Sequence, residues 1–222
     1  MAISQHEENY LKSILHLQIA QKGSGKVSTN AIAKSLGIQA ASVTEMMKRL
    51  SLAGYLIYER YQGVSLTESG WKAAAEIIRK HRLWETFLVN ELHFDWSEVH
   101  DIAEQLEHIQ SEQLINKLDA FLGYPQFDPH GDPIPNGDGQ FPEQQKISIT
   151  QMPMNVEMLV CGVAEDSATF LAYLQHLNIH IGITVKVLEK EDFDDSYEIL
   201  IGTQKLRLTA KAAENILVKK TD

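Results

Sequence analysis

The chain has 222 residues, of which 44% are hydrophobic and 23% are charged, a composition typical of folded, soluble domains. Its first residues, MAISQHEENY, lack the basic and apolar regions of a signal peptide, and no apolar run approaches the roughly 18 residues that a membrane span requires. The single cysteine, Cys161, excludes an intrachain disulfide and favours a reducing compartment, so we expect a cytoplasmic protein with no membrane partner.

Charge is distributed unevenly along the chain. The net charge of −10 argues against a nucleic-acid binder, but residues 1–75 hold eight Lys and Arg against five acidic residues. The remainder holds 12 basic and 25 acidic residues. This asymmetry is typical of a basic DNA-reading domain on an acidic body, and the alternative is chance fluctuation of surface charge.

Local signals predict three helices in the first quarter of the chain. The first begins at Ser4, where Glu7 three residues later completes a capping box. The second covers about residues 28–36 and ends at Gly37, and the third covers about residues 39–53. The stretch YLIYERYQGVSL follows as two short strands around a polar turn, which predicts a β-hairpin.

Two helices joined by a short turn and followed by a hairpin are the layout of a winged helix-turn-helix, in which the second helix of the pair enters the major groove. Short polar side chains at the start of that helix reach base edges, whereas Lys and Arg suit phosphates. Three-helix packings that do not touch DNA share the spacing, so they remain an alternative. The residues predicted to contact double-stranded DNA are Gln39, Ala41, Ser42, Thr44, Lys48, Arg49, Arg60 and Gln62.

A fourth helix is predicted from about Thr67 to Leu92, and a further one in VHDIAEQLEHIQSEQL, residues 99–114. Four side chains of that further helix, at relative positions 0, +4, +7 and +8, would lie within roughly a 100° arc. They are His100, Glu104, Glu107 and His108. With no Lys or Arg among them, this face indicates a site for a divalent cation, against the alternative of a solvated face.

A second pair supports the metal interpretation. His81 and Glu85 lie one turn apart in RKHRLWE, on the preceding long helix. Two antiparallel helices that each present His and Glu on one face can surround a divalent cation.

The composition changes at residues 124–146, which contain five of the six prolines and are predicted to form a linker or long loop. Strand-like runs dominate after it, interrupted by one helix at about residues 167–177. This pattern predicts a small barrel-like β domain, so the fold class is mainly α with a small C-terminal β-barrel.

Several stretches resemble the diphtheria toxin repressor and manganese transport regulator family of metal-dependent transcription repressors. The matching stretches are NYLKSI, ASVTEMMKRLSLAGYLIYERYQGVSLTESG, KHRLWETFL and VHDIAEQLEH, and FLAYLQHLNIHIGITVKV with LRLTAKAAENILV resembles the SH3-like domain of longer members. The resemblance implies a winged-helix DNA-binding domain at 1–75, a helical metal-binding and dimerisation domain at 76–123, a linker at 124–146 and an SH3-like domain at 147–222.

The resemblance also implies two metal sites. The primary site would comprise Asn9, His81, Glu104, Glu107 and His108, and the ancillary site would comprise Glu85, His100, Asp128, His130 and Asp166. Iron-sensing relatives place Cys at the position of Glu104, so the carboxylate predicts Mn²⁺, with Fe²⁺ as the alternative cofactor.

Two residues of the first helix depart from the family pattern. Asn9 stands where Asp or Met is common, and Lys12 stands where manganese-type members often carry Glu. Whether the primary site holds one metal or two is therefore open, and one hypothesis is that the Lys12 ammonium takes the place of the second metal.

The function that follows is a manganese-responsive repressor that binds palindromic DNA as a homodimer, controls metal homeostasis and has no small-molecule substrate. Without metal, Glu104 and Glu107 are expected to repel each other and to leave the first helix loosely held. The alternatives are an iron-responsive repressor of the same family and a metal-independent winged-helix regulator. A ferritin-like enzyme would require Glu-x-x-His on two helices, but Gln105 breaks that pattern, so we expect no enzymatic activity.

Overall fold

The computed structural model describes residues 3–21, 25–59, 61–143 and 145–220, and the chain divides into two compact units. The first unit comprises Met1–His81, Glu104–Ile115 and Pro135–Phe141, and the second comprises Arg82–Ala103, Asn116–Ile134 and Pro142–Asp222. The units cut across the four segments predicted from the sequence, so that division remains a prediction. The long helix α4, Glu68–Asn90, contributes its first part to one unit and its second part to the other.

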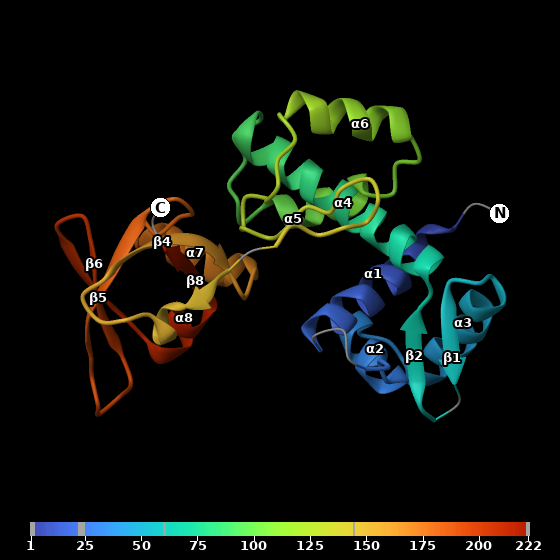
Figure 1. The fold of residues 1–222 in the computed structure, drawn as a ribbon, viewed down its shortest axis with the longest axis horizontal. Coiled ribbons are helices and arrows are strands. Elements are labelled where there is room, and N and C mark those ends of the chain that lie inside the picture. Colours follow the sequence, from blue (N-terminus) through green and yellow to red (C-terminus); the bar gives the residue numbers. More distant parts are fainter. Residues whose placement is uncertain (1–2, 22–24, 60, 144, 221–222) are drawn as a thin grey trace. The chain divides into compact units, whose positions relative to one another are not determined.

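The first unit contains a winged helix (Figure 1). Its elements are α1 (Gln5–Ala20), α2 (Thr29–Leu36), α3 (Ala40–Leu52), β1 (Leu56–Glu59) and β2 (Gly63–Leu66), and the two strands pair antiparallel. The predicted start signals are present, because the Ser4–Glu7 capping box caps α1 and the Ser28 side chain caps α2. Gly37 ends α2 in the left-handed conformation, which favours glycine.

Apolar side chains of the three helices and the hairpin form one core in this unit. The predicted inward face of α3, Val43, Met47 and Leu50, is fully buried. Tyr10 and Leu11 of α1 pack in the same core, which fixes the side of α1 that carries Glu8 and Lys12.

Helix α5, Val99–Leu106, covers only the first half of the helix predicted over residues 99–114, and the separate helix α6, Glu112–Phe121, corresponds to a second short helix predicted in SEQLINKLDAFLG, residues 111–123. The prediction was therefore wrong about the local structure of Glu107 and His108, which lie in a turn that follows α5. The turn closes with a backbone hydrogen bond from Ile109 to Leu106, and Ser111 begins the next helix. Glu107 thus leaves the helical arc and becomes fully buried.

The proline-rich segment 124–146 has no helix among its described residues, but it is not a loose tether. In the second unit, Gly131 has φ +81°, and a Cβ there would lie 2.0 Å from the carbonyl oxygen of Cys161, so only glycine fits. In the first unit, the indole of Trp71 donates a hydrogen bond to the carbonyl of Gly139 at 3.0 Å. The part around Gly131 is therefore packed in the second unit, and the part around Gly139 is packed in the first.

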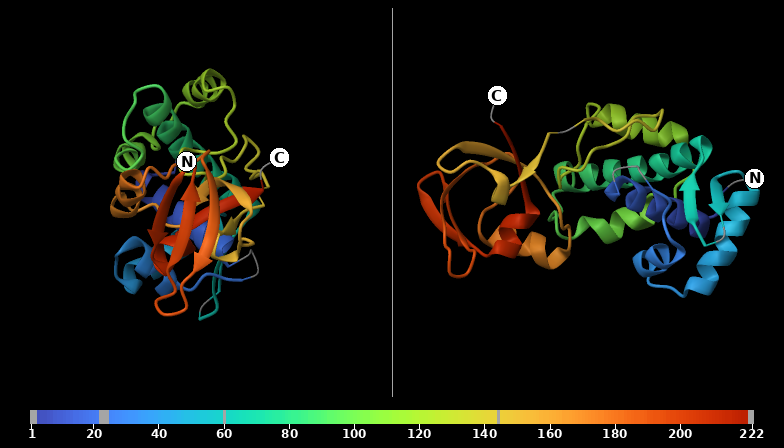
Figure 2. Two further views of the ribbon diagram at one scale, coloured as in Figure 1. Left: turned by 90° about the vertical axis from the view of Figure 1, so that its left-hand side faces the viewer. Right: turned by 60° about the horizontal axis from the view of Figure 1, so that its bottom comes forward.

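The C-terminal part of the second unit is a six-stranded sheet with the strand order β3-β8-β4-β5-β6-β7. The strands, several of which lie side by side in Figure 2, are antiparallel and cover β3 (Ile147–Ser148), β4 (Glu157–Val163), β5 (Thr184–Lys190), β6 (Tyr197–Ile201), β7 (Gln204–Leu208) and β8 (Ile216–Lys220). The single turn η1 (Ile149–Gln151) and helices α7 (Ala168–His176) and α8 (Ala210–Asn215) complete this part. Its own apolar core includes Val160, Leu174 and Ile199.

The predicted fold class, helical domains followed by a β domain, is confirmed. Closure of the sheet into a barrel is not observed in the described residues, because β3 and β7 are edge strands that do not pair with each other. None of the helices that the structure describes combines the length and apolar character needed to cross a bilayer.

Candidate metal centre

The first unit brings three of the predicted metal-site residues together around the ammonium group of Lys12. Lys12, on α1, donates to Oε1 of Glu104 at 2.6 Å and to Oε2 of Glu107 at 2.7 Å. Its Nζ also lies 3.3 Å from Nδ1 of His81 on α4. We call Lys12, His81, Glu104 and Glu107 the ammonium cluster. The expectation that the two glutamates repel each other is wrong, because a positive charge lies between them.

Glu107 has no exposed surface, and its two carboxylate oxygens differ in their surroundings. Oε2 accepts a hydrogen bond from Lys12 and lies 2.6 Å from Nδ1 of His81. Because a carboxylate oxygen can only accept, Nδ1 of His81 carries a hydrogen and donates it to Glu107, so it has no lone pair to accept from Lys12. Burial raises the pKa of Glu107, but the hydrogen bond from His81 and the charge of Lys12 outweigh it and hold that pKa below its ordinary value. Glu107 is therefore a carboxylate ready to bind a cation.

The other oxygen of Glu107, Oε1, is buried and has no hydrogen-bond partner among the described residues. The side-chain oxygen of Asn9 is likewise buried and without a hydrogen-bond partner among the described residues. Because a buried oxygen without a partner costs free energy, each such atom requires an explanation. A cation that took these oxygens as ligands would explain why neither has a hydrogen-bond partner.

His108 supplies a nitrogen on the Oε1 side of Glu107, and its orientation depends on Glu8, which was not predicted from the sequence. Nδ1 of His108 donates to Oε2 of Glu8 at 2.5 Å, and Gln110 donates to the other Glu8 oxygen at 2.7 Å. Nε2 of His108 is then the lone-pair nitrogen, and it lies 4.0 Å from Oε1 of Glu107. A carboxylate behind an imidazole is the arrangement that orients histidine ligands in metal sites.

The first unit contains further donor atoms of the kind that a hard divalent cation prefers. Asn9 and Glu107 offer oxygen atoms without partners, His108 offers a nitrogen, and the partly exposed Glu104 offers a second carboxylate. We call Asn9, Glu104, Glu107 and His108 the open donor set. Oxygen and imidazole ligands without a thiolate suit Mn²⁺ and Fe²⁺ better than soft metals.

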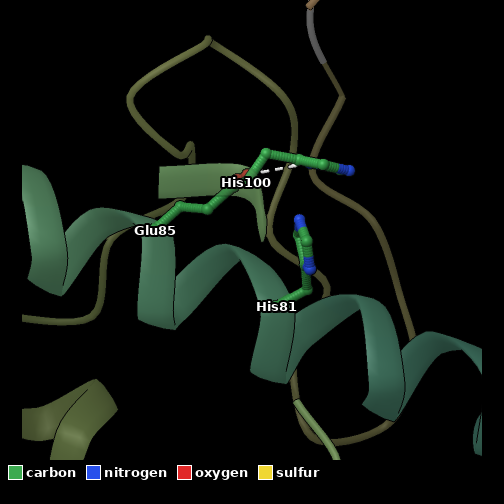
Figure 3. A group of neighbouring side chains, drawn as sticks. All are labelled: His81, Glu85 and His100. Carbon is green, nitrogen blue, oxygen red and sulfur yellow. Dashed lines mark ion pairs between the residues drawn. The ribbon is translucent and has the colours of Figure 1, made fainter. Parts of the chain in front are cut away.

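The predicted stripe of four side chains is divided between two places in the structure. His100 does not join Glu104 and Glu107 but lies in the second unit, where its Nδ1 is 3.5 Å from Oε1 of Glu85. Figure 3 shows this ion pair as a dashed line, with His81 projecting from the preceding turn of the helix that carries Glu85. The side chain of His100 is 48% exposed, whereas that of Glu85 is buried, so the pair joins an exposed residue to a buried one.

Glu85 also belongs to a buried group with two residues of the proline-rich segment. Ligand atoms of Glu85, Asp128 and His130 lie within 4.8 Å of one another, and all three residues are buried. Burial lowers the pKa of His130, but the neighbouring Glu85 carboxylate outweighs it and raises that pKa to about 9. Burial raises the pKa of Asp128 to about 7, with Glu85 and Asp132 adding to the shift. We call Glu85, Asp128 and His130 the loop cluster.

Asp128 has a structural role beside any role as a ligand. Its Oδ1 accepts the backbone N–H groups of His130 and Asp132, and its Oδ2 lies 3.5 Å from the guanidinium of Arg82. Arg82 in turn donates to the carbonyl of Pro133 at 2.5 Å. Asp166, the fifth predicted ancillary ligand, is exposed before α7 and joins none of the metal-type groups found among the described residues. Its ligation remains a prediction.

The predicted DNA-contacting residues are placed on α3 and the hairpin, and their roles remain predictions. Gln39, Ala41, Ser42 and Lys48 are exposed. The hydroxyl of Thr44 donates to the carbonyl of Ala40 at 3.0 Å, so its donor serves the helix itself.

Two basic side chains of this region, Arg49 and Lys26, form ion pairs with glutamates. The guanidinium of Arg49 lies 3.0 Å from Oε1 of Glu7, and Gln62 accepts from Lys26, which also pairs with Glu59 at 2.6 Å. Lys26 was not predicted. Arg60 lies outside the described residues.

A winged helix with an exposed polar helix, built into the same unit as a buried carboxylate and imidazole centre, defines a class of protein: a DNA-binding regulator that responds to a divalent cation. Residues 2–64 match the family described as "Iron dependent repressor, N-terminal DNA binding domain", and residues 67–136 match "Iron dependent repressor, metal binding and dimerisation domain". Residues 147–220 match the FeoA domain.

Individual relatives agree with these matches. An uncharacterized HTH-type transcriptional regulator of Methanocaldococcus jannaschii is 37% identical over 120 residues, which cover 54% of this chain and 94% of that protein. The HTH-type transcriptional regulator MntR of Lysinibacillus sphaericus is 35% identical over 111 residues, 50% of this chain and 77% of the relative. A solved manganese-dependent transcriptional repressor in complex with manganese is 36% identical, with a TM-score of 0.83 over 97% of this chain and 100% of that one.

The chain belongs to the iron-dependent repressor family, the family of the diphtheria toxin repressor and the manganese transport regulator. Its members are metal-dependent, DNA-binding transcriptional repressors rather than enzymes. The resemblance stated from the sequence is therefore confirmed.

Proposed function

We propose that this protein is a manganese-responsive repressor that binds a palindromic operator as a homodimer and controls metal homeostasis. The observation that carries the proposal is Oε1 of Glu107, a buried oxygen without a hydrogen-bond partner among the described residues, 4.0 Å from Nε2 of the oriented His108 imidazole. The names of two relatives, the manganese-dependent repressor and MntR, support manganese as the effector.

The open donor set links the start of α1 to the turn after α5. When bound, a divalent cation supplies positive charge and a preference for oxygen and imidazole donors. Asn9 would hold the α1 side of the site, and Glu107 and His108 would hold the other side. Glu8 accepts the Nδ1–H of His108 and so leaves Nε2 to face the cation. Because α1 packs in the same core as α3, this link restrains the DNA-reading helix, and a dimer so restrained has one spacing between its two reading helices.

The experiment is selection of duplexes from a random DNA library by the full chain in Mn²⁺, followed by gel shifts of the selected duplex in Mn²⁺, Fe²⁺, Zn²⁺ and chelator. We expect inverted repeats among the selected duplexes and the strongest shift in Mn²⁺ under anaerobic conditions. Equal selection in chelator would contradict metal dependence and would favour the metal-independent regulator. A stronger response to Fe²⁺ at equal free metal would favour the iron-responsive alternative.

A further inference from the structure

We infer that Lys12 is a built-in monovalent cation that occupies half of a potential two-metal centre, so that the primary site takes a single divalent ion. This inference deepens the proposed function and rests on it, because it concerns the same carboxylates. It starts from the observation that His81, Glu104 and Glu107 bring ligand atoms within 4.8 Å of one another, as a metal site requires. The space that these atoms surround already contains the Lys12 ammonium, at 2.6, 2.7 and 3.3 Å from them.

The carboxylate of Glu107 separates two cation positions. Its Oε2 faces Lys12 and His81, and its Oε1 faces His108 and has no hydrogen-bond partner among the described residues. A carboxylate that bridges two cations, each on its own oxygen, is the arrangement of two-metal centres, in which the ions lie about 3.5–4 Å apart. Here the cation at one of the two positions is the ammonium of Lys12, which is covalently part of α1, and Lys12 is nine-tenths buried.

Charge balance leads to the same conclusion. Glu104 and Glu107 carry two negative charges and Lys12 carries one positive charge, so the ammonium cluster has one uncompensated negative charge. One divalent ion at the open donor set neutralises it with a single charge in excess. A second divalent ion beside a buried ammonium would meet strong repulsion at low dielectric, because buried like charges interact far more strongly than exposed ones.

The same lysine changes the state of the protein without metal. It connects α1 to Glu104 of α5 through a short, partly exposed contact and to the turn that contains Glu107 through a short, buried one. Removing one partner of a buried ion pair is strongly destabilising. Lys12 therefore holds α1 before any metal binds, and the metal adds the contacts of Asn9 and His108 to an existing link.

The test compares the wild-type chain with Lys12→Glu, which replaces the ammonium by a third carboxylate. Bound Mn²⁺ is counted by elemental analysis after dialysis, and electron paramagnetic resonance distinguishes isolated from exchange-coupled ions. We expect the wild type to show only isolated Mn²⁺, and Lys12→Glu to bind about one additional Mn²⁺ per protomer and to show a coupled pair. Without metal, Lys12→Glu should melt at a lower temperature than the wild type, and Mn²⁺ should restore the loss.

Two further variants make the result unambiguous. Lys34→Glu makes the same charge change at an exposed position of α2 and should leave the Mn²⁺ count and the spectrum unchanged. Lys12→Gln offers a neutral amide oxygen and, if Lys12→Glu fails to fold, should by itself admit the additional ion. A coupled pair in the wild type overturns the inference, as does a folded Lys12→Gln protein with the wild-type Mn²⁺ count. If the wild type binds no Mn²⁺ at all, the proposed function fails instead.

Discussion

The ammonium cluster and the loop cluster both combine carboxylates with an imidazole, but they balance their charge differently. In the ammonium cluster, the permanent charge of Lys12 stabilises Glu104 and Glu107. In the loop cluster, a histidine with a pKa of about 9 faces Glu85, and Arg82 approaches Asp128 from outside. The difference teaches that in the first site a hydrogen bond from His81 and the fixed charge of Lys12 hold the pKa of Glu107 below its ordinary value, whereas the second site depends on a proton that an incoming metal must displace.

The strongest test of this comparison removes the shared carboxylate of the first site. We expect Glu107→Gln to reduce Mn²⁺ affinity at the open donor set by more than about 100-fold, because Glu107 supplies the bridging group for both cations. Mn²⁺-dependent DNA binding, measured by fluorescence anisotropy, should be lost while size-exclusion chromatography still reports the wild-type oligomer. Glu91→Gln, an exposed change near the end of α4, serves as the control. Wild-type Mn²⁺ dependence in a folded Glu107→Gln protein would exclude the site.

A smaller loss should follow from Glu8→Gln, which leaves every proposed ligand in place. Glu8 orients His108 through Nδ1, and loss of such an orienting group typically costs about 10- to 100-fold in metal affinity. Isothermal titration with Mn²⁺ measures the effect. Glu8→Asp, which keeps the charge, should recover part of the affinity, and wild-type affinity in Glu8→Gln would mean that Glu8 serves only to fill space.

The loop cluster should contribute less than the ammonium cluster. We expect Glu85→Gln to weaken Mn²⁺-dependent DNA binding about tenfold, within the usual range for a site coupled at a distance. His100→Ala removes only the exposed partner of Glu85 and should change the same measurement less than about fivefold. A larger effect for His100→Ala than for Glu85→Gln would reverse the assigned order of the two residues.

The smallest expected effect concerns metal choice. Glu104→Cys places a thiolate in the open donor set, which stabilises Fe²⁺ relative to Mn²⁺, so the ratio of the two activation constants should shift a few-fold toward Fe²⁺. The change is modest because Glu104 also pairs with Lys12, and that pair is lost for both metals. The constants must be measured anaerobically, and an unchanged ratio would show that Glu104 does not set metal choice.

Local signals made the winged helix predictable from the sequence. The Ser4–Glu7 capping box, the Gly37 stop and the hairpin each depend on neighbouring residues, and the structure contains all three. Candidate ligands on α4 and α5 could be selected because His and Glu recur there at helical spacing, and their ligation remains a prediction.

Long-range contacts were not predictable from the same signals. Nothing in the residues around Leu106 announces that α5 ends there, since the stretch contains neither Gly nor Pro, and Glu107 is held in its turn by partners on α1 and α4. The role of Glu8 depends on a contact with His108, 100 residues away in the chain. No local pattern marks such a pair.

The ion pair between Glu7 and Arg49 has a thermodynamic consequence. Glu7 lies in the first turn of α1, directly before Glu8 and Asn9, and its Oε1 lies 3.0 Å from the guanidinium of Arg49 on α3. A DNA phosphate that draws Arg49 away from Glu7 acts on the same turn of α1 that the metal ligands occupy. Because coupling between two binding events is reciprocal, the factor by which the metal raises the affinity for DNA is also the factor by which DNA raises the affinity for the metal. A repressor on its operator should therefore keep its metal at a metal concentration at which the free protein has already lost it, so release of the operator requires a lower metal concentration than dissociation from the free protein.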